Sequence, residues 1–224
     1  MAIRRTDAVC AIARRWPQRL GQLDELGLEY WTGTFDLATA CVANGLDCEQ
    51  VLAALNEPIG DPPPSWADLR FSALADHLLA EHHATLHRLL DELTGHVASR
   101  SPAFLDPPRT DDPVEQLHSV LRYHLRRAEN IAYPMIAALE HRPGPVTSPG
   151  TPLTKALQHI AAGYAEALKM LDQPLAGATR SGPILGDVRT ELRLHAHKTH
   201  NILLPDVACL EQPNREPSWE WWNQ

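Results

Sequence analysis

A motif that occurs twice in the same register constrains the fold of this chain more than any other feature. His124–Pro134 (HLRRAENIAYP) and His195–Pro205 (HAHKTHNILLP) each place a His ten residues before a Pro, with Asn-Ile six and seven residues after that His. Such internal repetition predicts two copies of one helix. Each copy is preceded by another helical segment that carries a His, at His83 and at His159. The sequence therefore predicts two helix pairs whose four histidines face one another, an arrangement suited to a metal site inside a bundle.

Breaks rich in Pro and Gly divide the chain from about residue 68 onward into four helices. The predicted spans are 68–98, 113–140, 152–171 and 183–210. Pro113 follows two Asp residues and suits the first position of the second helix. Four helices of this length with short to medium loops predict an all-α fold, specifically an up-down four-helix bundle.

Residues 1–57 are expected to form a small helical N-terminal domain ahead of that bundle. Its predicted helices are Asp7–Trp16, 17–26, Asp36–Asn44 and Asp47–Leu55. The Asp residues that open the last two helices suit the N-cap position. The Pro-rich segment 58–67 is expected to be a semi-rigid spacer, and 68–210 to be the bundle.

The remaining segment, 211–224, is a polar tail that contains Trp219, Trp221 and Trp222. Exposed tryptophans are costly in water, so the tail is expected to pack on the bundle or on a partner subunit. A homodimer formed through this tail and the N-terminal domain follows as one option.

Composition excludes several classes of partner. A formal net charge of -8 argues against a nucleic-acid partner, which would call for a basic patch. No window approaches the eighteen consecutive apolar residues of a membrane span, and the N-terminus does not resemble a secretory signal. The four cysteines show no Cys-x-x-Cys spacing, which favours reduced thiols and a cytoplasmic location.

The histidines are the candidate metal ligands. The strongest candidates, one from each predicted helix, are His83, His124, His159 and His195. His87 shares a helix face with His83, and His118 is close to three whole turns from Glu129, so these residues join the candidate set. His200 is also a candidate, His82 and His197 lie nearby, and His77, His96 and His141 are expected on the surface or in loops. Imidazole suits iron, zinc, copper and nickel alike.

Several of these motifs together resemble a known family. They are DHLLAEHH at 76–83, His124 with Tyr133-Pro134, Gln158-His159 with Gly163, and His195 with 201–205. The chain resembles the hemerythrin-like HHE domain, and residues 6–55 resemble the small domain that precedes it in repair-of-iron-centres (iron-sulfur cluster repair) proteins, which respond to nitrosative and oxidative stress. The resemblance implies a non-heme di-iron centre with His83, His124, His159 and His195 at ligand positions.

The chain departs from that family where its carboxylates should lie. Each bridging Glu of the family stands four residues after its His, and these positions are Ala128 and Thr199 here. Glu129 and His200 lie one residue further on, about 140° round an α-helix from their histidines, so only a local bulge would turn them inward. The family's Cys-Cys-Gly-Gly turn is replaced by 31–34, Trp-Thr-Gly-Thr.

Three functional hypotheses follow. The first is a di-iron protein of the family type that binds O₂ or NO or serves cluster repair, although two close ferrous ions need the anionic bridges that are missing. The second is a non-heme metal-dependent oxidative enzyme, with one or two ions of iron or another transition metal and a small-molecule substrate. Its centre would use Glu129, His118 or His87. The third is a metal-free binding or regulatory bundle.

Overall fold

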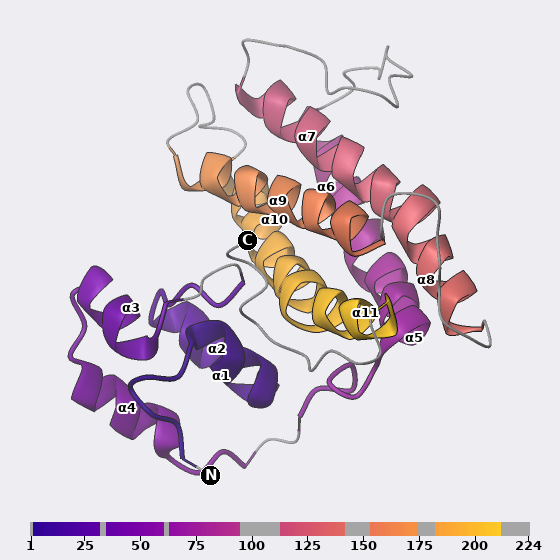
Figure 1. Ribbon diagram of the computed structural model, residues 1–224. Coiled ribbons are helices and arrows are strands. Elements are labelled where there is room, and N and C mark those ends of the chain that lie inside the picture. Colours follow the sequence, from indigo (N-terminus) through magenta and orange to yellow (C-terminus); the bar gives the residue numbers. More distant parts are fainter. Residues whose placement is uncertain are drawn as a thin grey trace.

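The structure is a computed structural model, and it describes residues 2–31, 35–60, 63–94, 113–141, 153–173 and 182–211. Within these ranges every regular element is a helix, and the only β-type pairing is an isolated bridge between Ala8 and Asp36. The predicted all-α class is therefore confirmed. Figure 1 shows short N-terminal helices on one side of a group of long helices.

The N-terminal residues form short helices close to the predicted spans. They are α1 (Val9–Arg15), a 3₁₀ turn (Pro17–Arg19), α2 (Leu20–Glu25), α3 (Leu37–Ala43) and α4 (Cys48–Asn56). The carboxylate of Asp36 accepts the backbone N–H of Thr39, and that of Asp47 accepts the N–H groups of Glu49 and Gln50. The predicted N-caps are thus confirmed.

The long helices also follow the predicted spans, with differences at their ends. The first comprises α5 (Phe71–His77), η2 (Leu78–His83) and α6 (Ala84–Thr94); the second α7 (Pro113–Arg127), η3 (Ala128–Ala132) and α8 (Tyr133–Glu140); the third α9 (Leu153–Asp172); the fourth α10 (Gly182–His197), η5 (Lys198–Leu203) and α11 (Leu204–Glu211). The first begins three residues later than expected, because 65–68 forms a turn in which Trp66 is buried.

The long helices pack along their lengths through leucine-rich faces. Helix α7 lies against α9, α10 lies against α6 and α9, and α5 lies against α8 (Figure 1). The fully buried side chains of this packing include Leu78, Leu86, Leu90, Leu121 and Leu157. Burial of one such side chain contributes roughly 1.5–3 kcal/mol. These residues and the buried side chains of the N-terminal helices belong to a single hydrophobic cluster.

Three of the long helices contain a π-helical turn, η2, η3 or η5. A π-helical turn holds one residue more than an α-helical turn and changes which residues share a face. Pro134 and Pro205 are the second residues after η3 and η5, respectively. A proline has no N–H and its ring collides with the carbonyl four residues earlier, here Asn130 and Asn201, so a wider turn at that point relieves the conflict. The repeated proline therefore marks a wide turn inside a continuing helix.

The N-terminal helices contact the fourth long helix through a buried polar group. Asn201 donates its amide to the carbonyl of Tyr30 at 2.7 Å and to Nδ1 of His197 at 2.8 Å. The His197 ring packs edge-on against Tyr30 and Trp66, with centroids 5.5 and 6.2 Å apart. His197 therefore joins segment 58–67 and the N-terminal helices to α10, and burial lowers its pKa to about 3.

Several expectations concern residues outside the described ranges. The tail beyond Glu211, with its three tryptophans, and His96 lie there, as do residues 32–34. The division into a 1–57 domain and a 68–210 domain remains a prediction. Cys10, Cys41 and Cys48 are free thiols, as expected.

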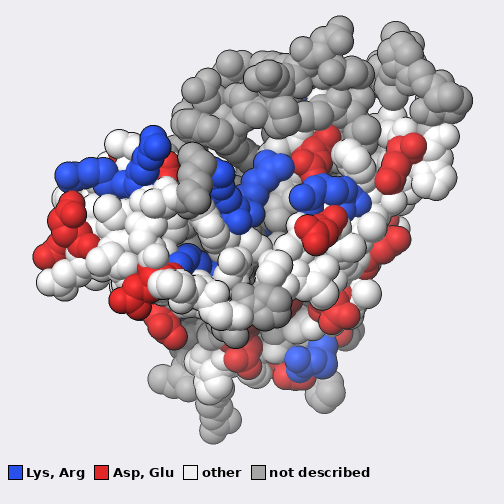
Figure 2. Space-filling view, turned by 90° about the horizontal axis from the view of Figure 1, so that it is seen from below, with Lys and Arg blue, Asp and Glu red and all other residues white. Residues whose placement is uncertain are grey.

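Two findings concern the length and apolarity of the described helices and the charges on one face. None of the described helices is both long enough and apolar enough to cross a bilayer. On the face drawn in Figure 2, Lys and Arg side chains lie among Asp and Glu side chains.

We predict that His197→Phe makes stability less dependent on pH. The folded pKa of about 3 lies below the unfolded value near 6.5, so His197 costs stability progressively as pH falls from about 6.5 towards 3. Urea unfolding measured between pH 7 and pH 4 should show a shallower decline for His197→Phe than for the unchanged protein. His141→Phe, at an exposed position, is the control and should keep the original slope. Equal slopes for His197→Phe and the unchanged protein would contradict this assignment.

Candidate metal site

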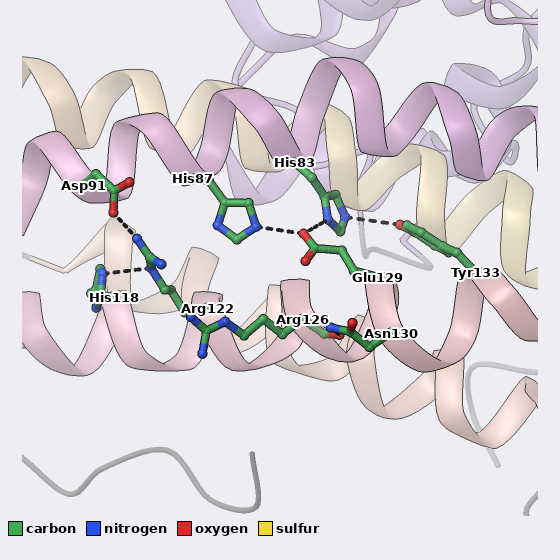
Figure 3. Close-up of polar contacts among 9 residues, drawn as sticks. All are labelled: His83, His87, Asp91, His118, Arg122, Arg126, Glu129, Asn130 and Tyr133. Atoms are coloured by element: carbon green, nitrogen blue, oxygen red, sulfur yellow. Dashed lines mark hydrogen bonds and ion pairs between the residues drawn. The ribbon is translucent and has the colours of Figure 1, made fainter. Parts of the chain in front are cut away.

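His83 and His87 present two imidazoles on one face of the first long helix. His83 ends η2 and His87 lies in the first turns of α6, so their spacing of four residues is α-helical. The ring centroids are 6.4 Å apart. Both rings lie on the same face of the helix, as their spacing predicts, and point towards the facing helix (Figure 3).

Glu129 comes from the facing helix and points between these two rings (Figure 3). Glu129 lies in the π-helical turn η3. In a regular α-helix its carboxylate would point away from the face that carries His124. Its Oε1 atom lies 2.8 Å from Nδ1 of His83 and 2.7 Å from Nε2 of His87. One oxygen therefore accepts hydrogen bonds from both imidazoles.

The group formed by His83, His87 and Glu129 has the donor set of a metal site. One ligand atom from each residue lies within 4.8 Å of the other two. Hydrogen bonds from His83 and His87 lower the pKa of Glu129 to about 2, and burial lowers the pKa of His83, so carboxylate and neutral imidazole are favoured at neutral pH. These are the protonation states that bind metals.

The group is closed on one side and open on the other. The His83 side chain is 2% exposed, whereas His87 and Glu129 are 28% and 25% exposed. The hydroxyl of Tyr133 lies 3.3 Å from Nε2 of His83, on the buried side. A hydrogen bond at the far nitrogen orients an imidazole ligand, which is the usual arrangement around bound metals. An ion could enter from the exposed side.

The four histidines predicted as one ligand set lie in two pairs. The His83 and His195 centroids are 5.0 Å apart, and those of His124 and His159 are 5.5 Å apart. The Tyr164 ring contacts one histidine of each pair, with its centroid 4.6 Å from that of His195 and 6.2 Å from that of His124. The expectation of four imidazoles converging on one point is not met among the described residues, because the ligand atoms found within 4.8 Å of one another belong to His83, His87 and Glu129.

Buried nitrogens without a protein partner lie next to the group. Both ring nitrogens of His195 and Nδ1 of His124 make no hydrogen bond within the described structure, and neither does the hydroxyl of Tyr164. Burial lowers the pKa of His195 well below its usual value, which keeps the ring neutral. Buried polar atoms normally have partners, so these atoms are candidates to bind an ion or a small polar molecule.

Two other candidates are engaged elsewhere. His118 accepts a hydrogen bond from Arg122 at 3.2 Å, and Arg122 also pairs with Asp91 (Figure 3). His118 and Glu129 were expected on one helix face, but they do not meet. Glu129 lies in η3, and the wider turn changes the direction of its side chain. His200 is buried and bonds with the backbone of Ala161 in α9.

Sequence reasoning missed two side chains that border the group. Tyr133 was part of the repeated motif, but its contact with His83 depends on the wide turn before it. Tyr164 is completely buried, and the only signal for it was its place directly after Gly163 in the motif around His159. Both phenols stay protonated because burial raises their pKa values.

Comparison with known proteins adds no assignment. No family model matches the chain, and no curated protein matches it either.

Gly163 provides the space that the His124 ring occupies. A Cβ atom at this position would lie 2.0 Å from Nε2 of His124. We predict that Gly163→Ala forces the ring to move and lowers the free energy of unfolding by about 1–3 kcal/mol, as overpacking does. Gly186→Ala is a matched control in helix α10, where an added Cβ meets no atom within 4 Å. Urea denaturation should show a loss only for Gly163→Ala; equal midpoints for the two variants would contradict the tight contact.

Proposed function

We propose that this chain is a non-heme metal protein whose ion is held by His83, His87 and Glu129. The observation that carries the proposal is the convergence of three ligand atoms within 4.8 Å, two from one helix and one from the facing π-helical turn. Two histidines and one carboxylate form the ligand set of many non-heme Fe(II) oxygenases. Iron is therefore the proposed metal, and the oxidative enzyme is the favoured hypothesis.

The residues around the group have separable roles in this proposal. The bound iron would supply redox chemistry and open coordination positions for O₂ and a small substrate. Tyr133 would hold the His83 ring in place from the buried side. His195 and Tyr164, whose polar atoms lack protein partners, would bind and orient a polar molecule next to the ion. The surrounding helices exclude water on the buried side.

A family-type di-iron centre is the second candidate. The free nitrogens of His195 and the His124–His159 pair favour it, because they are further imidazole ligands close by. It has one carboxylate instead of two, since Ala128 and Thr199 stand at the bridging positions. In either case we propose an up-down four-helix bundle of the hemerythrin-like type as the architecture.

Removal of single ligands tests the proposal. Glu129→Gln and His87→Ala should each weaken iron binding by more than the roughly 10–100-fold that loss of an outer partner costs, whereas Tyr133→Phe should fall within that range. Metal content and Fe(II) titration of tag-free, anaerobically reconstituted protein measure this. His141→Ala is the control for an exposed His. Unchanged iron binding in Glu129→Gln would refute the site.

Replacement of His124 separates the two candidates. A single ion on His83, His87 and Glu129 should persist in His124→Ala. A di-iron centre should lose at least one of its ions in the same variant, which the iron-to-protein ratio measures.

A further inference from the structure

A second polar cluster contains a buried lysine and shares no residue with the candidate metal site. Lys198 is 1% exposed, and its ammonium Nζ lies 2.8 Å from Nε2 of His77 and 2.6 Å from Nε2 of His82. The Trp66 ring centroid is 4.4 Å from the same atom. The expectation that His77 is a surface residue is therefore wrong, since it is half-buried and bonded to Lys198.

The donors and acceptors of this cluster match in number. An ammonium has three protons and no acceptor, so both imidazoles must accept through Nε2 and carry their own protons on Nδ1. The third proton can face the Trp66 ring in a cation–π contact. Nδ1–H of His82 donates to Oε1 of Glu191, whose negative charge offsets that of the ammonium.

This arrangement is that of a histidine metal site with an ammonium in place of the ion. In metal sites an imidazole binds the cation through one nitrogen and donates from the other to a carboxylate. Glu191, His82 and the Lys198 ammonium reproduce that order. His77 supplies a second imidazole, and the π-helical turn η2 brings these two histidines, five residues apart, to the same cation.

We infer that the Lys198 ammonium occupies a cation site formed by His77 and His82, and that it thereby keeps transition-metal ions out of this histidine pair. The inference deepens the proposed function, because it concerns which histidines of a His-rich chain remain available to metal. His82 and His83 are neighbours in sequence but serve different cations. Repulsion between an ammonium and a divalent ion in a buried place disfavours simultaneous occupancy.

Removal of the side-chain amine should open the site. Lys198→Ala should bind one more equivalent of Ni²⁺ than the unchanged protein, because two imidazoles and water are suitable ligands for that ion. The double variant Lys198→Ala with His77→Ala should lose the added equivalent. Lys198→Met keeps the length of the side chain and should also gain none. Calorimetric titration with Ni²⁺ and metal analysis of tag-free protein measure the difference.

Two outcomes overturn the inference. One is folded Lys198→Ala protein, verified by circular dichroism, that binds no more Ni²⁺ than the unchanged protein. The other needs no variant: ¹⁵N chemical shifts of the unchanged protein should show His82 protonated on Nδ1 and unprotonated on Nε2, and the opposite tautomer excludes the bond to Lys198. Failure of the proposed function can be distinguished from failure of this inference. The double variant Glu129→Ala with Lys198→Ala lacks a ligand of the proposed iron site but should still bind the added Ni²⁺ equivalent.

Discussion

Glu129 reaches the histidines of the first helix because the turn that carries it is wider than an α-helical turn. In a regular α-helix a residue five positions after His124 would face about 140° away from it. The π-helical turn Ala128–Ala132 turns Glu129 to within 2.8 Å of His83. The ligand set therefore depends on a backbone hydrogen-bond pattern as much as on residue types, and Pro134 contributes to that pattern by lacking an N–H.

The histidine-rich helices handle positive charge in two ways. On one side, two imidazoles and a carboxylate form a group that could hold a metal ion, and His87 and Glu129 of this group are partly exposed. On the other side, the chain supplies its own cation, Lys198, and covers it with Trp66. Burial lowers the pKa of Lys198 to about 8, which still leaves most of the amine charged at neutral pH. Adjacent residues His82 and His83 can serve the two clusters because successive side chains of a helix point in different directions.

Helix spans were predictable from the sequence because local signals define them. Asp36 and Asp47 are N-caps, Pro113 begins α7, and the leucine periodicity marks the buried faces.

The contacts between side chains were less predictable than the helix spans. The spacing rules for α-helical turns placed Glu129 on one face with His118 and turned it inward only if a local bulge formed, and the sequence did not show that the bulge forms. They also gave no sign that Tyr164 contacts both His124 and His195, since these contacts depend on packing between helices distant in sequence. The basic residue three positions after each repeated His, Arg127 or Lys198, was the one available signal for the second cluster.

The wide turns also affect how this chain corresponds to similar ones. A π-helical turn is equivalent to a single-residue insertion in a helix, so positions beyond Ala132 and Leu203 are offset by one from those of a chain with a regular helix. Glu129 lies inside the first of these turns, so its direction does not follow from counting residues from His124 at 100° each. An alignment that permits no gap within helices would mismatch the residues beyond each wide turn.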